Sequence, residues 1–166
     1  MEVYLIRHGI AAERGTYAND DERPLIDKGR TKTKKVAQSL KEVGVSFDAI
    51  LTSPLVRAKQ TADILFEAGL SSQVEFFSAL SPGGNIQDFV TWQCQKKYRN
   101  KSVALVGHQP DLGMWAEILV WGTAQGKIIV KKAGLIGIKF TSIDNNLIGN
   151  GELFLLSSPK FLTKNK

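Results

Sequence analysis

Residues 2–9, EVYLIRHG, are the most informative segment of the sequence. Its apolar middle has the length of one buried strand, and it ends abruptly in Arg-His-Gly. The same order recurs in VALVGH, residues 103–108, where Pro110 then starts an apolar helical pattern. Because ligands of open α/β sheets bind at the carboxyl ends of the strands, His8 and His108 should face one crevice if these two strands are neighbours.

Outward from residues 2–9, strand-like and helix-like patterns alternate along the chain. We expect strands at 2–6, 49–52, 74–77, 103–106, 135–140 and 153–156. We expect helices at 28–43, from Ser53 and Pro54 to near Gly69, around 86–94 and from Pro110 onward. A hairpin connection at 144–151 should join the last two strands. The pattern predicts an α/β fold in three layers, with a mostly parallel central sheet, helices on both faces and an antiparallel strand pair near the C-terminus.

Composition bounds the class of protein. The chain has 166 residues, 43% apolar and 23% charged, which excludes collagen-like and low-complexity chains and argues against disorder. We expect one domain at 1–159 followed by a basic tail at 160–166. No membrane span or secretory signal is visible, and one cysteine cannot form an internal disulfide, so a cytoplasmic location is expected. That cysteine, Cys94, lies on the apolar stripe of its helix and should be a small core residue.

The net charge of +6 favours anionic partners such as nucleic acid, a phosphorylated small molecule or a phosphoprotein. The basic residues are scattered over clusters at 28–35, 96–101, 127–132 and 160–166, and they match no nucleic-acid-binding motif. We therefore expect no nucleic-acid partner and no membrane partner. Within the third cluster, Lys131 and Lys132 are expected to be solvated.

Two arginines accompany the histidines. Arg7 adjoins His8, and Arg57 lies in the first helical turn after the second predicted strand, so it too lies at a strand's carboxyl end. A guanidinium offers a planar fork of donors that matches phosphate oxygens, and helix N-termini nearby favour negative charge. Two arginines and two histidines at strand ends predict a site for a tetrahedral dianion.

Three stretches, LIRHG at 5–9, SPLVRAKQTA at 53–62 and VGHQP at 106–110, resemble in order the motifs of the histidine phosphatase (phosphoglycerate mutase-like) superfamily. The small size and the Arg-Pro-Leu step at 23–25, followed by Gly29, resemble the SixA-type phosphohistidine phosphatases in particular.

The resemblance implies that His8 is the nucleophile, forms a covalent phosphohistidine and keeps one ring nitrogen on a backbone acceptor near Gly9. It implies that Arg7, Arg57 and His108 complete the catalytic set. The phosphate-binding residues that it implies are Arg7, Gly9, Arg23, Arg57, His108 and Gln109. Neither a metal nor another cofactor is expected, since the arginines already supply positive charge.

The stretch after the third predicted strand, residues 77–82, contains no Asp or Glu, whereas many ester-cleaving relatives carry an acid there. An imidazole, with a conjugate-acid pKa of about 6.5, leaves without that acid more easily than an alkoxide. The expected substrate is therefore a phosphohistidine-bearing signalling or phosphotransfer protein, and a glutamate at Ala79 would favour esters if it reached the leaving oxygen.

The alternatives are a small-molecule phosphomonoesterase or mutase and a non-catalytic phosphate-dependent binding module. Acids that could serve an esterase are Glu13, Asp20, Asp21 and Glu22.

Overall fold

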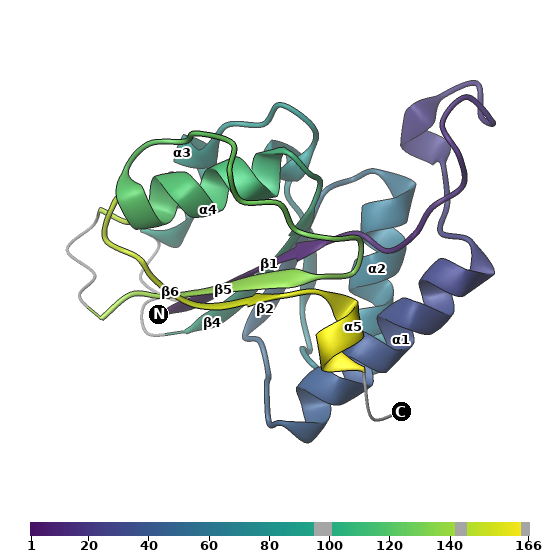
Figure 1. The fold of residues 1–166 in the computed structure, drawn as a ribbon, viewed down its shortest axis with the longest axis horizontal. Helices are drawn as coiled ribbons and strands as arrows, with labels where there is room; N and C mark the ends of the chain where they lie inside the picture. Colours follow the sequence, from purple (N-terminus) through teal and green to yellow (C-terminus); the bar gives the residue numbers. More distant parts are fainter. Residues whose placement is uncertain (95–100, 142–145, 164–166) are drawn as a thin grey trace.

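The computed structural model describes residues 1–94, 101–141 and 146–163. Its centre is a six-stranded sheet flanked by helices (Figure 1), and the strands follow the order β3-β2-β4-β1-β5-β6. The strands are β1 (Glu2–Arg7), β2 (Ala49–Thr52), β3 (Val74–Phe76), β4 (Ser102–Gly107), β5 (Leu135–Lys139) and β6 (Glu152–Ser157). The first four strands in this order are parallel, and β5 and β6 each run antiparallel to their neighbour.

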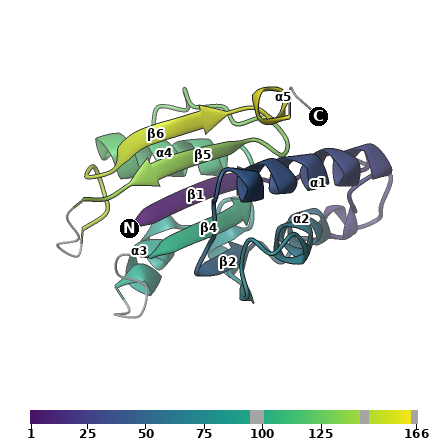
Figure 2. The same ribbon diagram turned by 90° about the horizontal axis from the view of Figure 1, so that it is seen from below.

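Helices cover both faces of the sheet. The α-helices are α1 (Asp27–Glu42), α2 (Val56–Glu67), α3 (Ile86–Gln93), α4 (Asp111–Trp121) and α5 (Pro159–Leu162), and short 3-10 helices are η1 (Asp20–Glu22) and η2 (Ser78–Leu80). Figure 2 shows α3 and α4 on one face and α1, α2 and α5 on the other. The predicted three-layer fold with a late antiparallel pair is confirmed.

The central strand β1 is buried on both faces, which explains its unbroken apolar run. Val3 and Leu5 pack in the apolar cluster beneath α3 and α4, whereas Tyr4 and Ile6 pack in the cluster beneath α1 and α2. A shift of one residue would exchange the two sets, so packing fixes the register in which Arg7 pairs with Gly107. This register brings the ends of β1 and β4 together.

A glycine near the start of α1 lets the loop after β1 pass against the helix. A Cβ at Gly29 would lie 1.9 Å from the carbonyl oxygen of Ile10, closer than any side chain can approach. The same carbonyl accepts a hydrogen bond from the N–H of Ile26 at 3.1 Å. This close contact holds the residues directly after His8 against the start of α1.

Two local predictions are wrong. Helix α2 begins at Val56, so Ser53 and Pro54 lie in the turn before it. Cys94 is exposed at the C-terminal cap of α3, and its neighbour Gln93 takes the buried position. The helical repeat predicts which face is buried only while the helix lasts, and α3 ends one residue before Cys94.

Parts of other predictions lie outside the described residues: 96–100 of the second basic cluster, 144–145 of the hairpin connection and 164–166 of the basic tail. The tail's first residues form the end of α5, with Pro159 buried. Among the helices of the described ranges, none combines the length and apolar character needed to cross a membrane.

Candidate active site

The two histidines meet at the carboxyl edge of the sheet. His8 follows β1 and His108 follows the adjacent parallel strand β4, so both rings leave the same edge. Their ring centroids lie 5.2 Å apart, and both side chains are buried. They line a cavity of about 610 Å³ together with Arg7, Arg23, Arg57 and Gln109. Gly9 does not line this cavity and acts through its backbone.

The orientation of His8 is fixed by backbone groups. Its Nδ1 lies 2.7 Å from the carbonyl oxygen of Gly9. Because a carbonyl only accepts, Nδ1 carries the proton and Nε2 keeps its lone pair. The N–H of Gly9 donates to Thr61 Oγ1 at 3.0 Å, and this hydroxyl donates to the carbonyl of Arg57 at 2.8 Å. Thr61, which the sequence analysis missed, thus ties the loop after β1 to α2.

Both imidazoles are neutral near pH 7. Burial is the main cause that lowers the pKa of His8 from 6.5 to about 3, with further lowering by His108, Arg57 and Arg7. Burial and then the positive charges of Arg57 and Arg7 lower the pKa of His108 from 6.5 to about 4. A neutral ring with a free Nε2 is what a nucleophilic histidine requires.

These depressed pKa values predict acid sensitivity of the fold. The chain's 2 histidines titrate near 6.5 when unfolded but at about 3 and about 4 when folded. Below about pH 6.5 the unfolded chain therefore binds protons that the folded chain does not, and stability decreases as the pH falls. At about pH 5 we expect the two histidines to contribute an uptake of close to two protons on unfolding. Urea titrations at several pH values measure this.

The matched control for that titration is the double variant His8→Gln/His108→Gln, which removes both titrating rings. Its free energy of unfolding should depend much less on pH between about pH 7 and about pH 5. A wild-type stability that stays constant over this range would contradict the neutral, buried state of the two rings.

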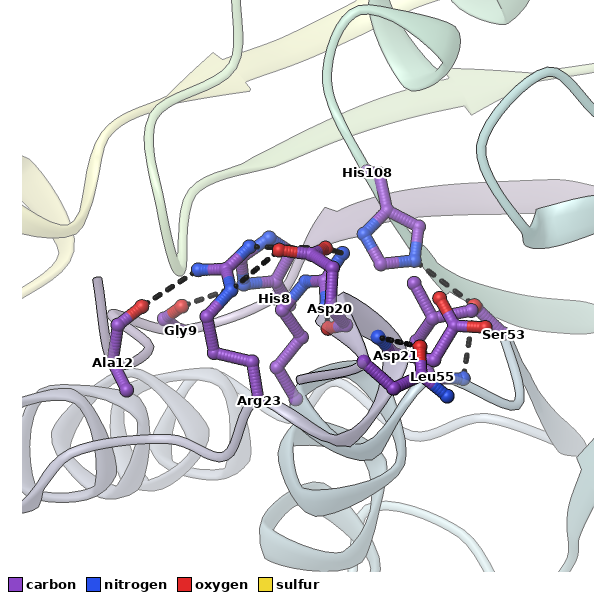
Figure 3. Close-up of polar contacts among 11 residues, drawn as sticks. His8, Gly9, Ala12, Asp20, Asp21, Arg23, Ser53, Leu55 and His108 are labelled. Carbon is purple, nitrogen blue, oxygen red and sulfur yellow. Dashed lines mark hydrogen bonds and ion pairs between the residues drawn. The ribbon is translucent and has the colours of Figure 1, made fainter. Parts of the chain in front are cut away.

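A serine holds His108. The Nε2 of His108 lies 2.9 Å from Ser53 Oγ, and this oxygen also accepts the N–H of Leu55 at 3.3 Å (Figure 3). Ser53 is fully buried, so its position in the turn before α2 is fixed. The sequence predicted only that this serine begins a helix, whereas in the structure its hydroxyl contacts the second histidine.

One carboxylate bridges two of the predicted arginines. Asp20, in η1, lies 2.9 Å from Arg23 Nε through one oxygen and 3.1 Å from Arg57 Nη2 through the other. The carbonyl of Asp20 also accepts from Arg57 Nη1 at 2.7 Å. The hydrogen bond from Arg23 is the main cause that lowers the pKa of Asp20, so this carboxyl is ionised near pH 7. Figure 3 shows the Asp20 carboxylate against the guanidinium group of Arg23.

Arg7 and Gln109 fix the segment on the other side of the cavity. Arg7 Nη1 donates to the carbonyl of Val130 at 2.9 Å. The Gln109 amide donates to the carbonyl of Ile128 at 2.9 Å and accepts the N–H of Val130 at 3.3 Å. Both ends of the Gln109 side chain are therefore bonded to backbone, which suits a positioning role more than direct contact with an anion.

Arg7 and Arg57 each keep a hydrogen-bond donor that no described residue accepts. Arg7 Nε and Arg57 Nε are buried and have no hydrogen-bond partner among the described residues. An unsatisfied buried donor costs free energy, and burial is the main cause that lowers the pKa of each guanidinium. An oxyanion in the cavity would offset both the desolvated charge and the missing acceptors.

The segment that contacts Arg7 and Gln109 is itself anchored by Glu117. This buried carboxylate in α4 accepts the backbone N–H groups of residues 125–128. Burial alone would raise the pKa of Glu117, but the four donors hold it below its ordinary value. The backbone N–H groups of residues 125–128 therefore bind the chain's own carboxylate.

The structure corrects the expectation about Ala79. Its side chain is only 6% exposed and packs in the core beneath α3 and α4, so it does not line the cavity. Pro82 lines it instead. Within the described ranges the carboxylates that line the cavity are Glu13 and Asp111, and the latter also accepts the N–H of Gly83 at 3.2 Å. Asp111, three residues after His108, was missed by sequence analysis.

Lys132 was also misjudged. It was expected to be solvated, but it is half-buried in the wall of the cavity. Burial, followed by the charge of Arg7, lowers its pKa. Lys131 is exposed as expected. In the part of the chain that the structure describes, no three His, Cys, Asp or Glu side chains come together as a metal site would require.

Known proteins share this architecture. Residues 3–114 match the family model of the histidine phosphatase superfamily (branch 1). An uncharacterised protein of Picosynechococcus sp. is 47% identical over 98% of this chain and 99% of its own length. The phosphohistidine phosphatase SixA of Escherichia coli is 31% identical over 68% of this chain and 70% of its own length.

A solved structure of the protein histidine phosphatase SixA complexed with tungstate has a TM-score of 0.84 at 27% identity, covering 98% of this chain and 99% of that chain. The site described above lies at the motifs by which the chain resembled such proteins, and the relatives support phosphatase activity. The chain belongs to the histidine phosphatase superfamily, branch 1.

Proposed function

We propose that this protein hydrolyses phosphohistidine on a protein substrate by transient transfer of the phosphoryl group to His8. The observation that carries the proposal is the state of His8: a buried, neutral ring whose Nδ1–H is bonded to Gly9 and which shares a cavity with Arg7, Arg57 and His108. The likeness to SixA supports the phosphohistidine substrate over other phosphates.

In the first step, Nε2 of His8 attacks phosphorus and the bond between phosphorus and the substrate's ring nitrogen breaks. The electron pair of that bond returns to the substrate ring, which departs as neutral imidazole when its other nitrogen carries a proton. Arg7 and Arg57 bind the phosphoryl oxygens and oppose the charge that gathers on them, and the neutral His108 donates a hydrogen bond to them when its ring proton is on Nδ1, the nitrogen that does not contact Ser53. The carbonyl of Gly9 stabilises the positive ring that His8 becomes.

In the second step, water attacks the phosphorus atom of the intermediate. The bond from phosphorus to His8 Nε2 breaks and its electron pair returns to the ring. The attacking water becomes an oxygen of dihydrogen phosphate, which releases a proton to bulk solvent near pH 7. His8 keeps its proton on Nδ1 throughout, so the ring is ready for the next turnover. The Gly9 and Thr61 bonds that fix the loop need not change.

The leaving group separates this proposal from its main alternative. No carboxylate reaches the cavity from the segment after β3, because Ala79 is in the core and Pro82 lines the wall. An imidazole can leave without an acid, whereas an alkoxide cannot leave readily. Glu13 and Asp111, which do line the cavity, are the specific observation that favours a small-molecule phosphomonoesterase instead.

The test is a side-by-side assay of a phosphohistidine protein, aryl phosphates and alkyl phosphates, with His8→Ala as the blank. We expect log kcat/KM to fall steeply as the leaving-group pKa rises, with phosphohistidine and activated aryl phosphates turned over and phosphoserine slow. Glu13→Gln and Asp111→Asn should leave phosphohistidine turnover within about threefold of wild type.

A flat dependence on leaving-group pKa that becomes steep in Glu13→Gln or Asp111→Asn would assign a general acid and favour the phosphomonoesterase. Tungstate binding with no turnover of any substrate would favour the non-catalytic binding module. The assay therefore separates all three functions.

A further inference from the structure

A second groove adjoins the catalytic cavity and is strongly basic. It has a volume of about 390 Å³ and shares the lining residues Arg7, Ile10 and Lys132 with the catalytic cavity, so the two spaces adjoin. Three further lysines line it from separate segments: Lys32 of α1, Lys131 before β5 and Lys160 of α5. We call this space the lysine groove. It exists because α5 packs beside α1 (Figure 2).

The charge of the lysine groove is not neutralised within the described ranges. No Asp or Glu lines it, and none of its lysines forms an ion pair there. By contrast, the exposed Lys59 and Lys101 each pair with an aspartate. Several unpaired cations around one concave surface raise the local potential and attract anions.

The chemistry of the groove differs from that of the phosphate cradle. The cradle uses buried arginines, whose planar forks match one tetrahedral anion. The groove uses lysines on three segments, which are separated point charges on flexible stems. Such an arrangement suits several carboxylates spread along a chain more than a second phosphate held at one point.

The lysine groove and the catalytic cavity differ in their acidic lining. Glu13 and Asp111 line the catalytic cavity and not the lysine groove, as does the basic Arg14, while Lys132 lines both spaces. Ile10 and the buried Pro159 add apolar surface within the groove. A chain that presents acidic residues on one side of its phosphohistidine would bind in one orientation.

We propose that the lysine groove binds an acidic segment of the protein substrate adjacent to its phosphohistidine. This inference rests on the proposed function and names the feature by which a substrate protein is selected. The groove then contributes mainly to association and orientation, and the chemistry at His8 is unaffected by it.

The test compares two phosphohistidine peptides of equal length, one flanked by Asp and Glu and one flanked by Ser and Gln. The variant is Lys32→Ala/Lys160→Ala, which leaves Arg7 and Lys132 in place. The matched control, Lys34→Ala/Lys35→Ala, removes the same charge from exposed positions of α1 that do not line the groove.

We expect the groove variant to lower kcat/KM for the acidic peptide about tenfold, mostly by raising KM. The kcat/KM of the variant for this peptide should also depend less on salt concentration than that of the wild type. The neutral peptide should change less than about twofold with either variant, and the control should change the acidic peptide less than about twofold. Equal losses for both peptides, equal losses in the control, or no loss at all would overturn the proposal.

A binding measurement separates this inference from the proposed function. An unphosphorylated acidic peptide should inhibit aryl phosphate hydrolysis by the wild type, and about tenfold less by the groove variant. If phosphohistidine is not a substrate but this difference remains, the proposed function fails and the groove stands. If the acidic peptide does not inhibit, or inhibits both proteins equally, the groove fails whatever the substrate is.

Discussion

Replacing His8 with Ala is expected to lower kcat by at least about 10³-fold, the largest effect of any single substitution in this chain. The variant loses the only ring nitrogen that the structure prepares for attack, with Nδ1–H held by Gly9 and the ring neutral. Steady-state kinetics with an aryl phosphate and with a phosphohistidine protein measure the loss.

Two controls show that the loss is chemical. Tungstate should still stabilise His8→Ala against thermal unfolding, because the arginines that bind the anion remain. His108→Ala should be slower than wild type yet still form a phosphoenzyme, since His8 is intact. Activity in His8→Ala within about tenfold of wild type would assign the nucleophile elsewhere.

Arg57→Lys is expected to lower kcat/KM about 10²-fold and to weaken inhibition by phosphate, vanadate and tungstate. Arg57 is only 3% exposed and uses two guanidinium nitrogens on Asp20, one on its carbonyl and one on its carboxylate. A lysine ammonium has all three donors on one nitrogen, so it cannot reproduce the planar fork that reaches both Asp20 acceptors and leaves Nε for a phosphoryl oxygen. Inhibition constants and kcat/KM measured on the same preparation test this.

Arg30→Lys is the matched control for this change. Arg30 lies in α1 and does not line the cavity. Its substitution by lysine is therefore the same chemical change made outside the site. It should leave both kcat/KM and anion inhibition within about twofold of wild type. Inhibition that is unchanged in Arg57→Lys would place Arg57 outside the anion site.

Periodicity predicted the layers well because both faces of β1 and β4 are buried. A short apolar strand that is followed by a glycine or by an apolar helix is compatible with few structures other than a buried strand of a parallel sheet. The pairing of β1 with β4 was expected only on condition that these strands are neighbours, since ninety-odd residues separate Arg7 from its partner Gly107. The structure supplies that pairing and with it the shared edge for His8 and His108.

The sequence did not identify the residues that position another side chain or loop of the site. Ser53 matches a helix cap as well as a partner for His108, and only the meeting of β2 with β4 distinguishes these roles. Thr61 was part of a recognised stretch, but its bond to the Gly9 loop depends on how α2 packs. Polar contacts between distant segments leave no periodic signal, so sequence patterns cannot predict them.

The sequence also could not predict which positions after β3 face the cavity and could carry a general acid. The lack of Asp and Glu after β3 was visible in the sequence, but whether position 79 faces the cavity was not. The short helix η2 turns Ala79 into the core, so a glutamate there would be a buried charge and would destabilise the fold. Carboxylates reach the cavity instead from the loop after β1 and from the first turn of α4.

The most direct test of the account is a rapid-quench experiment with a protein substrate that carries labelled phosphohistidine. The enzyme should acquire label within a single turnover, the bond should be stable in base and labile in acid, and mass spectrometry should place the phosphoryl group on His8. Release of phosphate in the first turnover with no label on the enzyme, or label on a residue other than His8, would contradict the covalent mechanism.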